Sequence, residues 1–77
     1  MKIGDKVFYI QEDYDWWINN GWEVSKEDWH IEGINITNNK LEIVIKSNNC
    51  KKYTSINDIF LDLHTAETVC KVRNKLL

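Results

Sequence analysis

The sequence contains no proline, so none of its segments carries the residue that most strongly interrupts helices and strands. It also contains no run of apolar residues near the roughly 20 needed to cross a bilayer. Residues 1–6 are interrupted by lysine and aspartate and lack the apolar centre of a secretory signal. We therefore expect a cytoplasmic protein in which the two cysteines, Cys50 and Cys70, are free thiols.

Sequence motifs for catalysis are missing as well. There is no glycine-rich phosphate loop, no HExxH motif and no nucleophile elbow. Asp62 and His64 are too close in sequence for a convincing proton relay, and a small core leaves little room for a water-excluding pocket. His30, Cys50, His64 and Cys70 could meet as metal ligands, but no pair has the close spacing of a zinc finger. We expect a non-enzyme with no catalytic residue, no cofactor and no metal.

Tryptophan, in contrast, is abundant and concentrated. All four tryptophans lie between Asp13 and Trp29, in the stretch DYDWWINNGWEVSKEDW. A chain of 77 residues forms a single domain, residues 1–77, with one small core. Because a tryptophan or tyrosine buries roughly 150–250 Å², part of this aromatic content must be structural. We expect Trp22 and Trp29 to fill the core.

The net charge of −2 conceals a difference between the two halves of the chain. Residues 1–39 carry eight acids and three lysines, whereas residues 40–77 carry seven bases and four acids. This distribution indicates a molecule with an acidic side and a basic side.

The hydrophobic pattern predicts short strands followed by one helix. Residues 6–10 are β-branched and aromatic, and residues 41–46 alternate between apolar and polar side chains. Further strands are predicted from residue 31, over 50–54 and over 59–61, with turns at 37–40 and 47–49. Asp62 is suited to cap a C-terminal helix.

The acidic-aromatic stretch contains two local signals. Asn19-Asn20-Gly21 predicts a tight turn, across which residues 16–18 and 22–24 would pair as a hairpin. Residues 25–28 have the form of a capping box, which predicts a single helical turn with Ser25 as its N-cap.

These elements predict a mainly β chain with one C-terminal helix, arranged as a small SH3-like barrel of about five strands. The segments MKIGDKVFYI, HIEGINI, KLEIVI and DIFLDLHTAETV resemble small SH3-like proteins encoded by phages and other mobile elements of low-GC bacteria. Residues 14–29 depart from that pattern and look like an insertion. Inserted segments are where a shared scaffold acquires its particular partner.

We expect the acidic-aromatic stretch to bind a basic partner protein. Tyr14, Trp16 and Trp17 would supply anchoring area. Five acids would steer and orient the partner, namely Asp13, Asp15, Glu23, Glu27 and Asp28. The resemblance implies a more specific role, as an inhibitor of a host nucleic-acid-handling protein such as a CRISPR effector. The plainer alternatives are a solvated acidic face and tryptophans that belong to the core.

Two other binding modes remain open at this point. Lys46, Lys51 and Lys52, with Tyr53 beside them, could follow the phosphates of a nucleic acid, although nucleic-acid binders are usually strongly basic. The tryptophans could also be buried between two copies of the chain in a homodimer.

Overall fold

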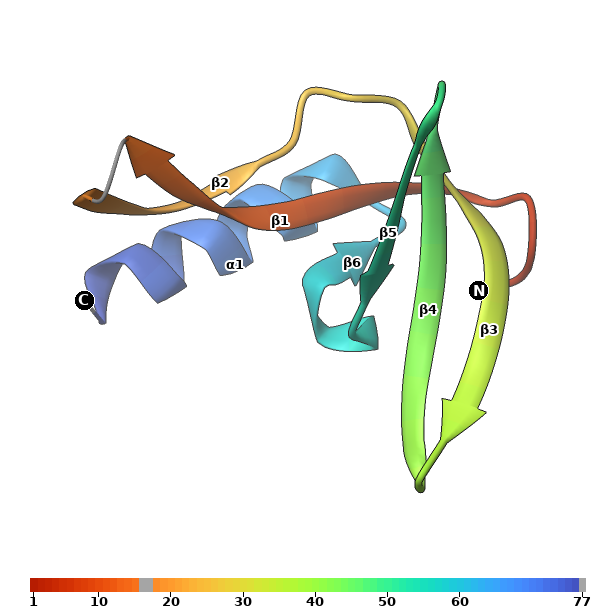
Figure 1. Cartoon of the computed structure of the whole chain (residues 1–77). Coiled ribbons are helices and arrows are strands. Elements are labelled where there is room, and N and C mark those ends of the chain that lie inside the picture. The colour runs from red at the N-terminus through yellow and green to blue at the C-terminus, as the bar shows by residue number, and fades with distance from the viewer. Residues whose placement is uncertain (16–17, 77) are drawn as a thin grey trace.

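A computed structural model describes residues 1–15 and 18–76 of the chain (Figure 1). The elements follow in the order β1 (Lys6–Asp15), β2 (Ile18–Val24), β3 (Trp29–Thr37), β4 (Lys40–Ser47), β5 (Cys50–Thr54), the 3-10 turn η1 (Ile56–Asp58), β6 (Ile59–Phe60) and α1 (Leu63–Lys75). The predicted class, mainly β with one C-terminal helix, is confirmed. No helix among the described residues is long and apolar enough to span a membrane.

The strands form one antiparallel sheet in the order β2-β1-β3-β4-β5, and the short strand β6 pairs with β1. Within the described residues, the outermost strands β2 and β5 do not pair with each other, so the sheet is open. The predicted barrel is therefore not confirmed. Helix α1 packs against β1 and β2, on the side of the molecule away from β3 and β4 (Figure 1).

Asparagine residues form the turns between the later strands, as the sequence predicts. Asn38 and Asn39 both have positive φ between β3 and β4, and Asn48 has positive φ between β4 and β5. Asparagine tolerates this left-handed region better than most residues, and two such residues in a row suit a tight hairpin.

The predicted turn at Asn19-Asn20-Gly21 is wrong, because these residues lie inside β2. Tyr14 pairs with Asn19 and Asp15 with Ile18, so β1 continues well beyond the predicted residues 6–10. Gly21 has φ +104°, and its freedom from a side chain lets the strand continue through that conformation. The predicted pairing partners Trp16 and Trp17 lie outside the described residues.

The predicted capping box is also wrong, because residues 25–28 form no helical turn. The Ser25 hydroxyl oxygen instead accepts a hydrogen bond from the indole Nε1 of Trp29, at 2.9 Å, and one from the backbone N–H of Glu27, at 3.3 Å. Trp29 is buried, and a buried indole N–H needs an acceptor. The need of the buried indole for a hydrogen-bond acceptor thus sets the conformation of the segment between β2 and β3.

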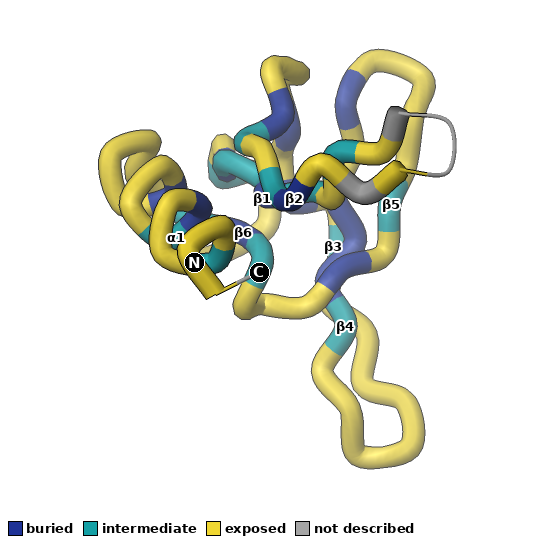
Figure 2. The backbone as a smooth tube through the Cα atoms, turned by 90° about the vertical axis from the view of Figure 1, so that its left-hand side faces the viewer, coloured by how far each residue is buried: buried dark blue, intermediate teal, exposed yellow. Residues whose placement is uncertain are grey.

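The core lies between β1, β3, β4 and β6. Its buried side chains are Val7, Trp29, Ile31, Ile43, Ile45 and Ile59, and Tyr9 packs against them. Figure 2 draws the buried segments of the chain in dark blue. Trp29 is only 1% exposed, which confirms its predicted place. Trp22 is half-buried instead and lies away from this cluster, beside the helix.

Helix α1 begins after Asp62, which caps it as predicted. Its carboxylate accepts hydrogen bonds from the Thr65 backbone N–H at 2.9 Å and from the Thr65 hydroxyl at 3.0 Å. The helix buries Ala66 and Cys70. Both cysteines are free thiols, with Cys50 exposed and Cys70 buried, in agreement with the prediction.

We predict that Asp62→Ala lowers the melting temperature at neutral pH and that this difference closes in acid. The hydrogen bonds from Thr65 hold the pKa of the Asp62 carboxyl below its ordinary value. Its contribution to stability is therefore present above the pKa of the unfolded chain and is lost as the pH falls through the lower folded pKa. Thermal unfolding followed by circular dichroism at several pH values measures the difference, and Asp62→Asn, which keeps an uncharged accepting oxygen, is the control. A difference that stays unchanged in acid would contradict this account.

Candidate functional site

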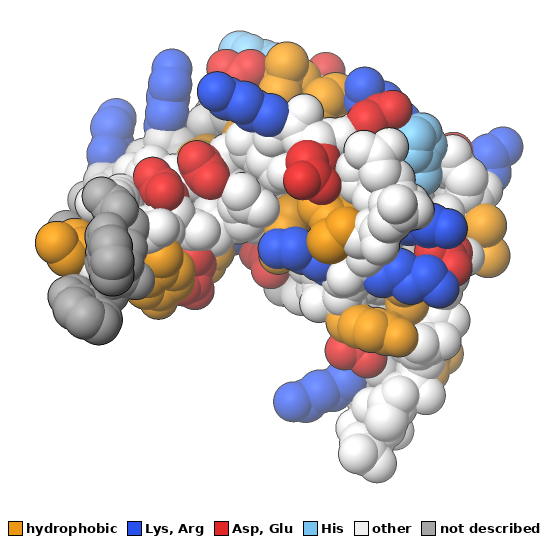
Figure 3. Space-filling view, turned by 45° about the horizontal axis from the view of Figure 1, so that its top comes forward, with side chains coloured by type: hydrophobic (Ala, Val, Ile, Leu, Met, Phe, Trp, Pro, Cys, Tyr) orange, Lys and Arg blue, Asp and Glu red, His pale blue; other side chains and the backbone are white. Residues whose placement is uncertain are grey.

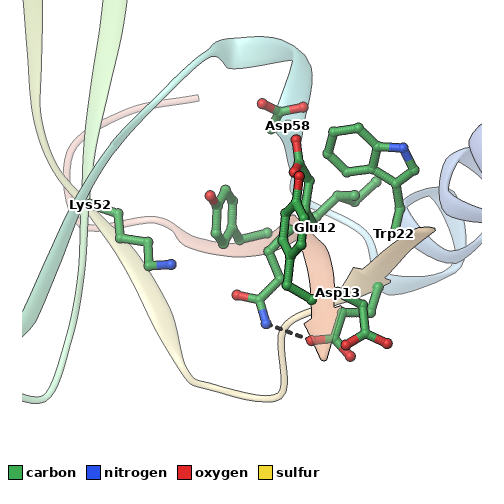
Figure 4. A pocket seen from close by; sticks show the side chains of 10 residues that line it. Glu12, Asp13, Trp22, Lys52 and Asp58 are labelled. Atoms are coloured by element: carbon green, nitrogen blue, oxygen red, sulfur yellow. Dashed lines mark hydrogen bonds between the residues drawn. The ribbon is translucent and has the colours of Figure 1, made fainter. Parts of the chain in front are cut away.

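The acidic residues of β1 and β2 border an open hollow of about 570 Å³ (Figure 4). We call it the acidic hollow. Its lining residues are Tyr9, Ile10, Gln11, Glu12, Asp13, Tyr14, Trp22, Glu23, Lys52 and Asp58. They come from β1, β2, β5 and η1, so only the folded sheet brings them together.

A β-bulge places consecutive residues of β1 around the hollow. Glu12 pairs with Trp22 and Tyr14 with Asn19, so Asp13 alone faces Asn20 and Gly21, and the extra residue of the bulge belongs to β2. In a regular strand, neighbouring side chains point to opposite faces. Because a bulge increases the local twist of the paired strands, Glu12, Asp13 and Tyr14 can all line the same hollow.

A cross-strand hydrogen bond fixes the neighbouring acid. Gln11 and Glu23 are direct partners in the β1–β2 pairing, and the Gln11 amide Nε2 donates to the Glu23 carboxylate at 2.8 Å. This bond, drawn as a dashed line in Figure 4, restrains Glu23 without neutralising its charge.

Tyr9 connects the hollow to the core. Its ring meets Trp29 edge to face, with the ring centroids 5.8 Å apart, and the Lys52 ammonium lies 5.4 Å from the centroid of the Tyr9 ring. Burial raises the pKa of the Tyr9 hydroxyl, and the nearby carboxylates of Asp58 and Glu12 raise it further, against a hydrogen bond with Thr54. The negative charges of Asp58 in η1 and of Glu12 in β1 therefore both act on this hydroxyl.

Tyr14 is the most exposed aromatic ring of the hollow, at 58%. A hydrogen bond with Glu12 raises the pKa of the Tyr14 hydroxyl, and the negative charge of Glu12 adds to the effect. The polar end of this side chain is thus already occupied within the protein, while its ring stays open to solvent. An aromatic ring held in this way is suited to an interface anchor.

The last turn of α1 supports the other wall. Asn74 uses both ends of its amide on Trp22, accepting from the backbone N–H at 2.7 Å and donating to the backbone carbonyl at 3.1 Å. The Arg73 guanidinium lies 4.9 Å from the centroid of a ring of Trp22. It also bonds the Asp58 carboxylate at 2.8 Å and the carbonyl of Asn57 at 2.8 Å. Arg73 and Asn74 therefore hold β2 and η1 to the helix.

The hollow carries a net negative charge, even though Arg73 pairs with one of its carboxylates, Asp58. Four carboxylates and one ammonium line it, in the order Glu12, Asp13, Glu23, Asp58 and Lys52. Figure 4 shows Lys52 and Trp22 on opposite sides, with Glu12 between them in this view. A concave surface that carries one sign of charge focuses the field and attracts the opposite charge.

The hollow unites three of the predicted partner-binding residues, namely Asp13, Tyr14 and Glu23. Glu27 lies along a neighbouring groove of about 530 Å³, which shares Gln11, Glu23 and Lys52 with the hollow. Asp28 lies apart, 3.3 Å from the Lys6 ammonium. Asp15 ends β1, but its side chain, like Trp16 and Trp17, lies outside what the structure describes.

The predicted partner-binding set did not include the other seven lining residues of the hollow, namely Tyr9, Ile10, Gln11, Glu12, Trp22, Lys52 and Asp58. Lys52 was predicted to act with Lys46 and Lys51 on a nucleic acid, yet it faces the hollow on the side of the sheet that carries the core. Neighbouring residues of a strand point to opposite faces, so the predicted strand over 50–54 already carried the signal that separates Lys51 from Lys52.

Lys46 and Lys51, the other two lysines of that prediction, lie on the opposite face of the sheet. Direct pairing aligns Lys6 with His30, His30 with Lys46, and Lys46 with Lys51, across β1, β3, β4 and β5. We call these four exposed residues the basic row. Tyr53 lies two residues beyond Lys51, on the same face, and is 64% exposed.

Carboxylates partly neutralise the basic row. The Lys51 ammonium lies 2.8 Å from the Glu32 carboxylate, and Lys6 pairs with Asp28. Figure 3 shows lysine and acidic side chains interspersed on the face of the molecule that it draws.

Neither surface is arranged as a metal centre. Across residues 1–15 and 18–76, no three side chains of histidine, cysteine, aspartate or glutamate are grouped so that they could hold a metal ion. Comparisons of this chain with models of protein families, with curated proteins and with solved structures find no match.

Proposed function

We propose that this protein is a non-enzymatic binding module that captures a basic partner protein at the acidic hollow. The observation that carries the proposal is the convergence of four carboxylates and three aromatic rings around one open concave surface. Carboxylates at the rim would steer a basic partner toward the hollow and fix its orientation. Tyr14, with the neighbouring Trp16 and Trp17 that the sequence predicts as anchors, would supply apolar contact area.

The finer form of the proposal is an SH3-like protein of a phage or other mobile element, acting in the cytoplasm on a host nucleic-acid-handling protein such as a CRISPR effector. The resemblance of its sequence segments supports this origin. The 3-10 turn between β5 and β6 and the return of β6 to β1 support an SH3-like arrangement. An acidic surface can occupy a groove built for nucleic acid because it presents a similar charge.

The test is to reverse two exposed charges of the hollow with Glu12→Lys and Glu23→Lys in one variant. We expect capture of a basic protein from a host lysate to be lost, and association of the purified pair to slow by at least about 10-fold at low salt. The matched control is Glu42→Lys with Glu67→Lys, which changes the net charge equally outside the hollow. Circular dichroism establishes that both variants are folded. Equal capture by the hollow variant and the control would contradict the proposal.

A second candidate function, binding of single-stranded nucleic acid, is favoured by the alignment of the basic row beside the exposed ring of Tyr53. We predict that Lys46→Glu with Lys51→Glu would abolish binding to an oligonucleotide, and that binding by the wild type would weaken steeply as salt rises. Fluorescence anisotropy measures both effects, with Lys71→Glu and Lys75→Glu on α1 as the control pair. Wild type that binds no oligonucleotide at low salt would eliminate this candidate.

A further inference from the structure

The hairpin of β3 and β4 projects from the body of the protein as an exposed arm, residues 33–42 (Figures 1 and 2). Three apolar side chains lie on one face of the arm. Ile36 and Leu41 are direct partners, and Ile34 lies two residues before Ile36 on the same strand. They are 79%, 46% and 44% exposed, in the order Ile36, Leu41 and Ile34. Isolated apolar residues on a surface are ordinary, but three on one face of an arm form a patch.

The outer edge of β3 along this arm is open. β1 pairs with β3 only at Trp29 and His30, and two backbone bonds from Gly4 and to Asp5 extend the contact as far as Ile31. Beyond Ile31, no other strand in the described part of the chain pairs with this edge. The edge offers unpaired backbone donors and acceptors, which are a template for another strand.

The open edge also lacks the devices that usually protect such strands. Residues 33–39 contain no charged side chain, and the chain contains no proline. Edge strands are ordinarily protected by lysine, proline, a bulge or a covering loop. The bulge near Gly33 lies at the base of the arm, so the strand beyond it is regular.

We infer that the open edge of β3 pairs with the same edge of a second copy of this chain, antiparallel, with Asn35 opposite Asn35 of the second copy. In this register Ile34 of each copy lies opposite Ile36 of the other, and Gly33 lies opposite Thr37. Shifting the centre to Ile34 would set Ile36 against Glu32, and shifting it to Ile36 would set Ile34 against Asn38. The register centred on Asn35 is the one that matches all four isoleucines, because paired residues share a face of the sheet.

The properties of the arm favour a second copy over an unrelated strand. The segment is its own complement in the antiparallel sense, and an uncharged segment creates no repulsion between identical chains. Pairing would join the two apolar patches into one layer of six side chains, Ile34, Ile36 and Leu41 from each copy. No residue that lines the acidic hollow lies on the arm, so each copy would keep its hollow accessible.

Sedimentation equilibrium of the wild-type protein over a range of concentrations tests the inference. We expect a monomer–dimer equilibrium, and loss of the dimer in Ile36→Lys, which places a charge in the apolar layer of both copies. Val72→Lys is the matched control, because Val72 is an apolar residue 52% exposed on α1. A wild type that stays monomeric into the millimolar range would overturn the inference. So would a dimer that withstands Ile36→Lys but dissociates with Val72→Lys.

Disulfide trapping tests the register and does not depend on the folding of the lysine variant. In a Cys50→Ser background, Asn35→Cys should form a covalent dimer on mild oxidation, since directly opposed residues lie within disulfide range. Glu42→Cys is the control, because Glu42 is the β4 partner of Asn35 and would lie about 14 Å from its own copy, three strand spacings away. Equal trapping at both positions, or none at Asn35, would overturn the register. A monomer whose β3 amides become protected from exchange only with an added strand peptide would assign the edge to a different chain.

Discussion

Replacing Trp29 with alanine is expected to lower the free energy of unfolding by about 3–5 kcal/mol, the range for truncating a large buried aromatic side chain. Trp29 is 1% exposed and belongs to the main core cluster. A domain of this length has a total stability of about 4–12 kcal/mol on general grounds. The variant would therefore lose a large share of its stability, which urea unfolding followed by far-UV circular dichroism measures.

Two milder variants separate packing from hydrogen bonding at this site. Trp29→Phe keeps a ring beside Tyr9 but removes the indole N–H that donates a hydrogen bond to the Ser25 hydroxyl. Ser25→Ala keeps the whole indole and leaves its buried N–H without this acceptor, which should cost about 1–3 kcal/mol. If Trp29→Ala cost no more than Ser25→Ala, the indole would not be the centre of the core.

The parts of the fold that could be predicted are those set by local signals. Strand alternation over residues 41–46, asparagine at the turns and Asp62 at the start of the helix each act within a few residues. Such signals need no knowledge of distant contacts. Their agreement with one another is what made the class of the fold accessible from the sequence.

The predictions that failed did so where the core imposed its own requirement. The pattern of residues 25–28 fits a helix cap, but the buried indole N–H of Trp29 needs an acceptor, and the Ser25 hydroxyl supplies it. Asn19-Asn20-Gly21 has the composition of a turn, yet pairing with β1 extends the strand through it. Tertiary context overrides local preference in both cases.

Part of the candidate site could be predicted from the sequence. Asp13, Tyr14 and Glu23 belong to the acidic-aromatic stretch, so their gathering is a local property. Lys52 and Asp58 come from elements far along the chain, and only the pairing of β6 with β1 and the order of the strands brings them to the same hollow. No composition or spacing rule supplies that register.

Arg73 carries the second large prediction, because one guanidinium connects three elements. It bonds Asp58 and Asn57 of η1 and lies over Trp22 of β2. The two charged side chains are each less than a third exposed, at 24% and 30%, so solvent screens their pairing only in part. We expect Arg73→Met, which keeps an apolar stem, to lower the free energy of unfolding by about 2–3 kcal/mol.

A double-mutant cycle locates the source of that loss. Asp58→Asn alone removes the charge from one partner, and the coupling energy between Arg73→Met and Asp58→Asn isolates the ion pair from the stacking on Trp22. Hydrogen exchange should show faster exchange of amides in η1 for both variants, while the Trp22 amide stays partly protected because Asn74 still accepts from it. Lys71→Met, an exposed change on the same helix, is the control and should cost less than about 0.5 kcal/mol. If Arg73→Met cost no more than this control, the last turn of α1 would not support the wall of the acidic hollow, and Trp22 and Asp58 would be positioned by the sheet alone.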